Sequence, residues 1–136
     1  MKIFDKTLAL LEKSLDLRAT RHRVIAGNVA NEETPGYRAK EYNFLDALTA
    51  AAQQEGNHSS LAVTQTGHLG PRGHAFQKVS GQIEEIPSPD LPLDGNSVNL
   101  EVEMAKLSDN AMNYNTTGQI MSIRFRQLLA AIRDAR

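Results

Sequence analysis

Apolar residues recur along one face of a helix at both ends of this 136-residue chain. Steps of four and three residues through positions 4–29 meet six apolar residues in eight, with Arg18 and His22 as the exceptions. The same steps through positions 100–132 meet nine apolar residues in ten, with Gly118 as the exception. This spacing is typical of helices that pack along a narrow seam. It predicts two long terminal helices that pair as an antiparallel coiled-coil hairpin.

The large apolar residues on these two seams are the candidates for helix packing and for subunit contacts. They are Leu8, Leu11, Leu15, Ile25 and Val29 in the first helix, and Leu100, Met104, Leu107, Tyr114, Met121, Phe125, Leu128 and Ile132 in the second. Leu10, Leu17 and Val24 form another stripe at seven-residue spacing, which a single partner helix leaves uncovered. We therefore expect a further copy of the chain to cover this stripe.

Two polar interruptions of the seams have different interpretations. Arg18 and His22 form a polar waist in the first seam, where they are expected to set the register of the helix pair. Gly118 stands among asparagines and threonines that are weak helix formers. Either the second helix bends at Gly118, or the glycine permits the close approach of a partner helix.

The middle of the chain has a different composition. Positions 56–95 hold six glycines and four prolines, which favour turns and interrupt helices. Short strands are expected at 61–66 and 77–86, but too few large apolar residues are present for a compact core. The fold is therefore predicted to be mainly α, with a mostly irregular middle segment that allows one short β-hairpin.

This pattern divides the chain into three regions. We expect the first helix of the coiled-coil core at 1–31, a turn followed by the flexible middle segment at 32–97, and the second core helix at 98–136.

The segment from Asn28 to Tyr37 has the features of a helix end followed by a tight turn. Asn28 and Asn31 lie three residues apart on one helix face, so they can bond the free carbonyl groups of the helix end or bond a neighbouring chain. Pro35 and Gly36 occupy positions that suit a type II turn. Tyr37 presents an aromatic ring with a polar tip, which can pack against a helix or a partner.

The order N-x-A-N-x-x-T-P-G-Y after an amphipathic helix resembles the signature of the bacterial flagellar rod and hook family of axial proteins. The signature is matched at Asn28, Ala30, Asn31, Thr34, Pro35, Gly36 and Tyr37. The stretch DGNSVNLEVEM at 94–104 and the helical ending of the chain resemble, more narrowly, the proximal rod members of that family. The likeness covers residues 5–45 and 92–136 and is loose between them.

The resemblance implies a structural subunit of the proximal rod, which self-assembles with other rod proteins into the drive shaft that transmits motor torque for motility. The implied partners are other rod subunits, the adaptor that joins the rod to the membrane ring, and the type III export apparatus. The implied location is the periplasmic rod of the basal body, reached from the cytoplasm without a cleaved signal peptide. The first helix and the 28–37 turn would serve both export recognition and subunit docking.

Charge supports contacts between copies more than contacts with nucleic acid. The formal net charge of -1 gives no global attraction to nucleic acid or to an anionic membrane. Six Lys/Arg oppose three Asp/Glu in 1–24, four oppose one in 124–136, and five oppose twelve in 32–110. Basic ends and an acidic middle suit end-to-middle contact between copies, although a plain solvated surface explains the counts equally well.

Several other classes of protein find little support. The chain has no cysteine, so disulfides and thiolate chemistry are excluded. No apolar run approaches the roughly 18 residues that span a bilayer, so no membrane insertion is expected. The N-terminus also lacks the features of a secretory signal peptide.

Catalytic and metal chemistry are not expected either. The histidines lack acids at ligand spacing, so neither a metal site nor a cofactor is predicted. These histidines are His22, His58, His68 and His74. The glutamate pairs at 84–85 and at 101 and 103 are interpreted as surface charge, and no phosphate-binding or hydrolase motif is present. Two other classes remain as alternatives: a soluble two-helix adaptor or regulator that binds a partner helix, and a helical DNA-binding protein that uses the basic ends.

Overall fold

The computed structural model describes residues 2–57, 78–87 and 93–134. Three helices and two short strands follow one another in this part of the chain. Their bounds are α1 Lys2–Ala30, β1 Lys40–Asn43, α2 Leu45–Asn57, β2 Gln82–Glu85 and α3 Leu100–Asp134. The predicted mainly helical fold is therefore confirmed.

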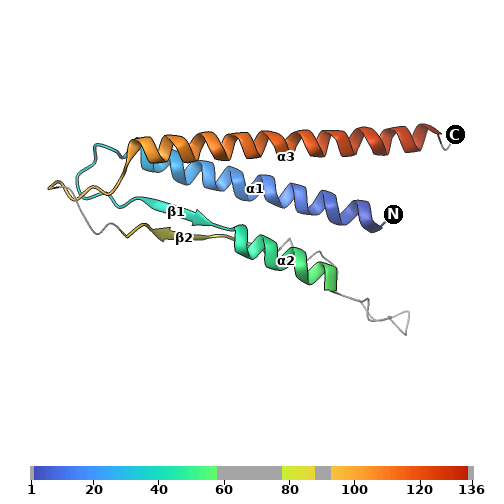
Figure 1. Cartoon of the computed structure of the whole chain (residues 1–136), viewed down its shortest axis with the longest axis horizontal. Helices are drawn as coiled ribbons and strands as arrows, with labels where there is room; N and C mark the ends of the chain where they lie inside the picture. Colours follow the sequence, from blue (N-terminus) through green and yellow to red (C-terminus); the bar gives the residue numbers. More distant parts are fainter. Residues whose placement is uncertain (1, 58–77, 88–92, 135–136) are drawn as a thin grey trace.

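The two terminal helices, α1 and α3, lie side by side and run in opposite directions (Figure 1). Asn28 Nδ2 donates a hydrogen bond to Glu103 Oε2 at 2.8 Å, and Asn110 Nδ2 donates to the carbonyl oxygen of Arg18 at 3.0 Å. α1 has 29 residues and α3 has 35, so α3 is longer by about 9 Å at 1.5 Å per residue. The antiparallel pairing of the terminal helices is confirmed, whereas its coiled-coil form stays a prediction.

A small sheet and α2 cover a side of α1 that α3 leaves open (Figure 1). β1 and β2 are antiparallel, with Lys40 opposite Glu85 and Tyr42 opposite Ile83. β2 lies within the strand predicted at 77–86, whereas the strand predicted at 61–66 lies outside the described residues. The sequence did not predict β1 or α2, because it placed both in an irregular middle segment.

The buried apolar core lies between α1 and this second layer. Tyr42 and Phe44 are two residues apart, so they project from the same face of the extended chain, with ring centroids 5.8 Å apart. They pack with Leu17 of α1 and with residues of the middle segment. The full cluster is Leu17, Tyr42, Phe44, Ala51 and Val79, with Ala9, Leu10, Val24, Leu48 and Ala52 packed against it.

One expectation about packing is wrong. The stripe of Leu10, Leu17 and Val24 does not need another copy for its cover, because β1 and α2 of the same chain supply it. The two aromatic rings of the core come from positions 42 and 44, before the 56–95 segment for which no compact core was expected. Both aromatics come from a strand of only four residues and the position after it, too short a stretch to show a clear period of two.

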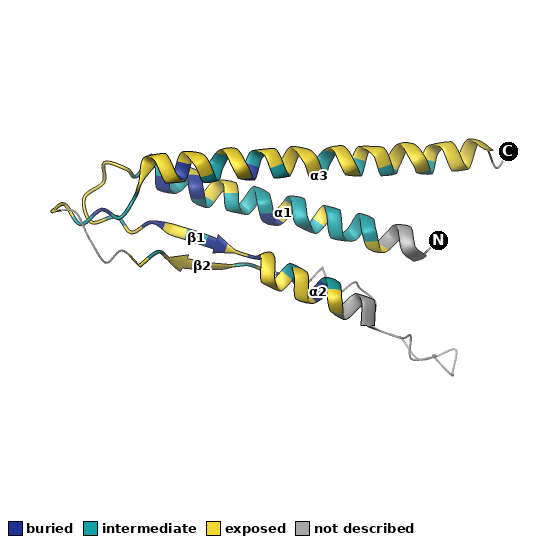
Figure 2. Cartoon of the chain, in the orientation of Figure 1, coloured by how far each residue is buried: buried dark blue, intermediate teal, exposed yellow. Residues whose placement is uncertain are grey.

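Most of α3 is exposed along its length (Figure 2). Its two buried residues, Glu103 and Asn110, are seven positions apart, and both contact α1. Of the seam residues, Ile25 is buried, and Leu8, Leu11, Leu15, Val29, Leu107, Met121 and Leu128 are half-buried. The exposed seam residues are Leu100, Met104, Tyr114, Phe125 and Ile132. The buried residues of α3 are thus two polar side chains in its first third, and much of its apolar seam lies at the surface.

Gly118 lies in an unbroken stretch of α3, which runs straight past it (Figure 1). No atom lies within 4 Å of the position that a Cβ would take there. Among the described residues, the helix therefore neither bends at Gly118 nor meets a closely approaching segment.

Candidate functional site

Asn28 is the first residue of the signature and lies in the last turn of α1, where its side chain is fully buried (0% exposed). Its Nδ2 donates to the carbonyl oxygen of Lys40 at 2.7 Å and to Glu103 Oε2 at 2.8 Å, and its Oδ1 accepts from Lys40 N at 2.9 Å. The hydroxyl of Tyr37 also reaches Asn28 Oδ1 at 3.4 Å. One amide thus joins α1, the start of β1 and the start of α3. Asn28 was expected to bond either helix-end carbonyls or a neighbouring chain, and it instead bonds two other elements of its own chain.

Asn31 and the residues after it form the predicted turn. Asn31 Nδ2 donates to the carbonyl oxygen of Gly27 at 2.7 Å, which meets one of the free carbonyl groups of the helix end. Thr34 Oγ1 donates to Asn31 Oδ1 at 3.2 Å, and Tyr37 N donates to Thr34 O at 3.2 Å. Gly36, the third residue of the turn, has a φ of +74°. These features fit the type II turn expected from the Pro-Gly pair.

The loop before α3 is hydrogen-bonded to this turn. Asn96 is buried (4% exposed), and its Nδ2 lies 2.9 Å from the carbonyl oxygen of Asn31 and 3.0 Å from that of Thr34. Gly36 N donates to Asp94 O at 2.9 Å, and Ser97 N donates to Tyr37 O at 3.0 Å. The two halves of the family-like sequence, more than fifty positions apart, therefore form one hydrogen-bonded unit. We call this unit, residues 28–40 with 94–103, the junction.

Gly95 is the second residue of the junction with a positive φ, at +72°. A Cβ at Gly95 would lie 3.6 Å from the Cα of Gly36, so the two glycines approach each other closely. The sequence did not predict roles for Gly95, Asn96 or Ser97. Asp94 Oδ1 accepts from Asn96 N, and Asn96 Oδ1 accepts from Val98 N. An Asp-Gly-Asn-Ser run is typical of such turns, so the sequence contained a local signal for a turn at 94–97. It contained no signal for the segment that this turn contacts.

A chain of charges continues from the junction across three elements. Glu103 is buried (2% exposed), and its Oε1 lies 2.9 Å from Lys106 Nζ. Lys106 Nζ also lies 3.3 Å from Glu41 Oε2, and Glu41 Oε1 lies 3.0 Å from Arg21 Nη2. Burial would lower the pKa of Lys106, but the hydrogen bonds and charges of Glu103 and Glu41 outweigh it, so the pKa of Lys106 is raised. The network ties α3 to β1 and β1 to α1.

Arg18, one residue of the predicted polar waist, lies over the second layer. Its guanidinium carbon is 5.8 Å from the centre of the Phe44 ring, a cation–π contact. Burial, and secondly the charge of Arg21, lower the pKa of Arg18, while Asp109 opposes this shift. His22, the other residue of the waist, is exposed.

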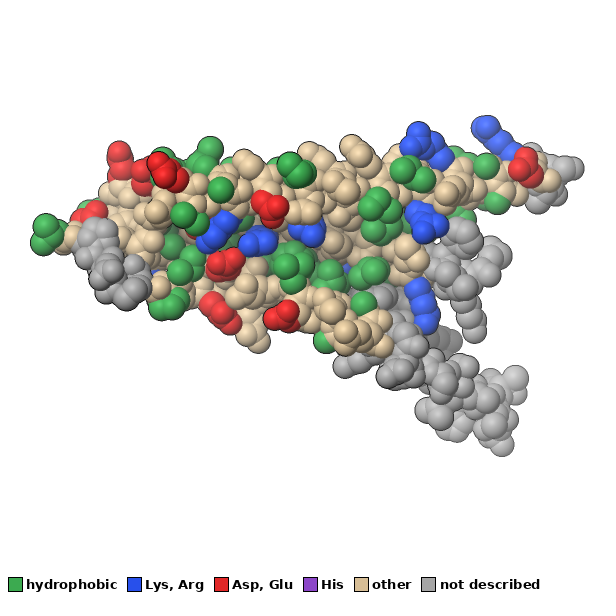
Figure 3. Space-filling view, in the orientation of Figure 1, with side chains coloured by type: hydrophobic (Ala, Val, Ile, Leu, Met, Phe, Trp, Pro, Cys, Tyr) green, Lys and Arg blue, Asp and Glu red, His purple; other side chains and the backbone are tan. Residues whose placement is uncertain are grey.

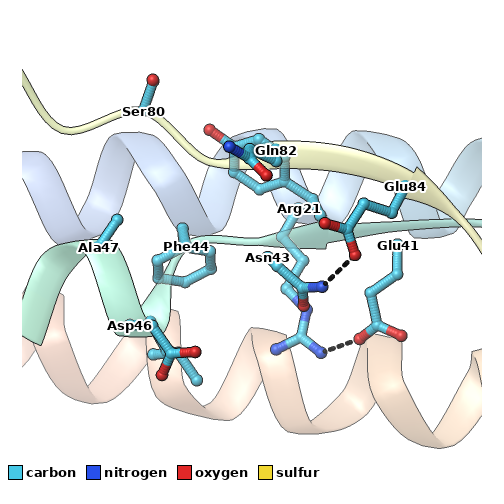
Figure 4. Close-up of a pocket in the computed structure, with 11 residues that line it drawn as sticks. Arg21, Glu41, Asn43, Phe44, Asp46, Ala47, Ser80, Gln82 and Glu84 are labelled. Atoms are coloured by element: carbon cyan, nitrogen blue, oxygen red, sulfur yellow. Dashed lines mark hydrogen bonds and ion pairs between the residues drawn. The ribbon is translucent and has the colours of Figure 1, made fainter.

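A groove of about 700 Å³ runs beside the sheet (Figure 4). Arg21 points to Glu41 across it, and Asn43 Nδ2 donates to Glu84 Oε2 at 3.1 Å. Both carboxylates are thus held by neighbouring cations or amides. Across the ranges that the structure describes, no group of three His, Cys, Asp or Glu side chains is arranged to hold a metal ion. The polar side chains in this groove hold the layers together.

Exposed apolar side chains mark α3 as the main candidate surface for assembly (Figure 3). Ile120, Ile123, Phe125, Leu129 and Ile132 are between 43% and 63% exposed. At 3.6 residues per turn, Ile120 and Ile123 lie on one face of α3, and Phe125, Leu129 and Ile132 lie on the opposite face. Apolar side chains on both faces of the helix are therefore open to a partner. Of the described helices, none has the length and apolarity that crossing a membrane requires.

The residues of the signature differ in their access to a partner. Asn28 is buried, and Asn31 and Tyr37 are half-buried. Those at the surface are Ala30, Thr34, Pro35 and Gly36. The signature therefore combines a buried asparagine that bonds within the subunit with a turn that is exposed at the surface.

Comparison with known proteins gives a consistent set of relatives. The chain is 31% identical, over 132 residues, to the flagellar basal body rod protein FlgB of Aeromonas hydrophila, covering 96% of this chain and 95% of that protein. It is 29% identical, over 134 residues, to FlgB of Escherichia coli K12, with the same coverage, and 31% identical, over 130 residues, to FlgB of Cereibacter sphaeroides, covering 96% of each. No protein-family model matches the chain.

Proposed function

This chain belongs to the FlgB family of flagellar basal body rod proteins, and from that membership we propose that it is a structural subunit of the proximal rod, which self-assembles with other rod proteins into the shaft that transmits motor torque. The observation that carries the proposal is the apolar surface of α3. Its five exposed residues between Ile120 and Ile132 have no cover from the described parts of the chain. Burial of each such side chain would contribute about 1.5 to 3 kcal/mol to association.

The junction suits a subunit under mechanical load. Torque passed through a subunit pulls its two terminal helices relative to each other. The bonds of Asn28, the three-element charge network and the buried Asn96 resist that motion at one end of the helix pair. Buried hydrogen-bonded side chains such as Asn28, Asn96 and Glu103 favour one arrangement of the backbone, because a displacement leaves their polar groups without partners.

The surface residues of the signature are the proposed docking positions. Ala30, Thr34, Pro35 and Gly36 contact a neighbouring rod subunit or the adaptor that joins the rod to the membrane ring, whereas Asn28 acts within the subunit. Support comes from their exposure, which contrasts with the burial of Asn28. The apolar seam residues of α1 and α3 contribute to packing and to the subunit interface.

Export by the flagellar type III apparatus, without a cleaved signal peptide, is part of the same proposal. The subunit then takes its place in the periplasmic rod. A cysteine-free chain whose main buried cluster consists of five residues is suited to unfolding and threading. Recognition by the export apparatus is assigned to α1 together with the 28–37 turn.

The test is deletion of the gene, followed by swimming assays and electron microscopy of isolated basal bodies. Deletion is expected to abolish motility and to leave basal bodies without a rod. The wild-type gene supplied in trans should restore both. A second variant, Phe125→Asp on the exposed surface of α3 and outside the segment assigned to export, should fold and be exported but restore few rods. Swimming deletion cells with complete rods would overturn the assignment, and a purified chain that forms one small fixed oligomer would favour the adaptor alternative.

A further inference from the structure

The final part of α3 has no companion helix among the described residues. α1 and α3 are antiparallel and bonded to each other at the junction. At the other end of the pair, the C-terminus of α3 extends past the N-terminus of the shorter α1 (Figure 1). The last three turns of α3, of which only the final part extends past α1, present Arg126, Leu129, Ile132 and Arg133, which we call the α3 tip. All four are exposed, with Leu129 at 57% and Ile132 at 63%. Arg126, Leu129 and Arg133 follow the i, i+3, i+7 spacing, so they share one face.

The opposite end of the molecule has the same apolar character and the opposite charge. Leu93 is fully exposed there, beside the exposed Asp94. Glu84 and Glu85 at the end of β2 and Glu101 at the start of α3 are exposed as well (Figure 3). We call these residues, Glu84, Glu85, Leu93, Asp94 and Glu101, the acidic end. Two exposed cations, Arg38 and Lys40, lie in the same part of the fold, with Lys40 opposite Glu85, and the exposed Glu32 and Glu33 balance them.

The fold produces this sorting of charge. Antiparallel pairing brings the basic first and last segments of the chain to one end, and the acidic middle follows the turn to the other. A helix dipole favours acids at the start of α3 and Arg133 at its end, which accounts for Glu101 and Arg133. It does not account for Glu84, Glu85 or Asp94, which lie outside α3.

We infer that the α3 tip of one copy of this chain docks on the acidic end of a second copy, in a head-to-tail contact. The inference rests on the proposed assembly into a rod, for which it names the two contacting surfaces. The tip cannot reach the acidic end of its own chain, because α3 holds Glu101 about 40 to 50 Å from the residues of the tip. Contact between unlike surfaces repeats from copy to copy without closing, as a filament requires. Opposite charges fix the polarity of stacking, since tip-to-tip and end-to-end encounters bring like charges together.

The test uses two charge-reversed variants of the full chain. The tip variant carries Arg126→Glu and Arg133→Glu, and the end variant carries Glu84→Lys, Glu85→Lys and Glu101→Lys, all at exposed positions. Each variant alone has two ends of like charge, so its self-association should weaken at least about tenfold. An equimolar mixture should associate again, because the tip of each variant then meets an end of opposite charge on the other. Asp16→Lys, on the exposed side of mid-α1, is the matched control and should associate like the wild type.

Association is measured by sedimentation velocity and electron microscopy, with circular dichroism confirming the fold of every variant. Wild-type assembly should also weaken between about 50 and 500 mM NaCl, since salt screens exposed charges. The inference is overturned if the wild type stays monomeric, if either variant alone assembles normally, or if the mixture does not recover. Salt-sensitive binding of a DNA duplex that the tip variant abolishes would assign the tip to nucleic acid and also overturn it. Variants that fail to assemble head-to-tail but still build complete rods in cells would overturn the docking inference and leave the rod assignment standing.

Discussion

The side chain of Asn28 fixes the relative positions of α1, β1 and α3. Its amide presents a donor and an acceptor to the backbone of Lys40, as a neighbouring strand would, and its second donor hydrogen meets the buried carboxylate of Glu103. No charged residue could replace it there, because only an amide offers two donors together with an acceptor. The signature therefore needs an asparagine at this position for the fold of the subunit itself.

Replacing Asn28 by aspartate should lower the free energy of unfolding by about 3 kcal/mol, because two hydrogen bonds are lost and a second carboxylate is placed against Glu103. Urea unfolding at neutral pH measures the change. Asn115→Asp is the matched control on the exposed side of α3, where the cost should stay below about 0.5 kcal/mol. Equal losses in the two variants would contradict the role given to Asn28.

Gly118 and Gly36 form a pair for which the same substitution should act in opposite directions. At both positions the space that a Cβ would occupy has no atom within 4 Å, but only Gly36 has a positive φ. Gly118→Ala should raise the free energy of unfolding by about 0.5 to 1 kcal/mol, because alanine is the better helix former. Gly36→Ala should lower it by about 1 to 2 kcal/mol, because the backbone conformation is strained for alanine.

Chemical unfolding of both glycine variants measures these changes. A destabilised Gly118→Ala would show that something in the chain approaches the helix there after all. If Gly118→Ala is more stable as a purified chain but fails to restore motility in deletion cells, the glycine serves close packing against a neighbouring subunit.

At the scale of elements, the sequence predicted the parts that repeat a period over many residues. Both terminal helices and the type II turn follow from local patterns. The contact line between the helices does not, because Glu103 and Asn110 look like surface residues until Asn28 and Arg18 face them. α2 was missed since its apolar residues are mainly alanines, and its position depends on packing against the aromatic core.

The junction has the same division between local and distant information. The Asn31 cap and the Gly36 turn could be inferred from their own neighbours. The bonds from Asn96 to the turn join positions more than sixty residues apart, and no local pattern specifies such a partner. Local sequence patterns therefore predicted the helix end and the turn, whereas the long-range hydrogen bonds of Asn96 are evident only in the folded chain.

The charge network between elements should depend on pH in a specific direction. The pKa of Lys106 is raised in the folded chain, so the native state binds its proton more tightly than the unfolded state does. Its stabilising effect is complete below the ordinary lysine pKa of 10.5 and is lost as the pH rises through the higher folded value. Stability at neutral pH should therefore include the full contribution of this ion pair.

Lys106→Met tests this sign. At pH near 7 the variant should lose about 2 to 4 kcal/mol, because Glu103 remains buried without its cation. The difference from the wild type should narrow as the pH rises above 10.5 toward the raised pKa of folded Lys106, at which the wild-type lysine also loses its charge. Lys40→Met, an exposed lysine, is the control. A difference that stays constant with pH would mean that methionine disturbs packing and that the charge of Lys106 contributes little.

At the scale of the whole molecule, burial is graded along the long axis. Buried side chains gather where α1, α3 and the sheet meet, and exposure increases along α3 toward its last turns (Figure 2). Local unfolding requires the least free energy where few buried contacts must be broken. The subunit should therefore be most stable at the junction and least stable at the α3 tip.

Hydrogen exchange can map this gradient and the proposed assembly together. In the isolated chain, amides around Glu103 and Asn110 should exchange at least about tenfold more slowly than those of the α3 tip, because the tip opens without breaking buried contacts. In assembled wild-type chains the tip amides should become protected, while the tip variant under the same conditions should gain nothing. Strong protection of the tip in an isolated monomer would mean that the chain already covers it. Neither the apolar surface nor the charge of the tip would then be available to drive the stacking of subunits.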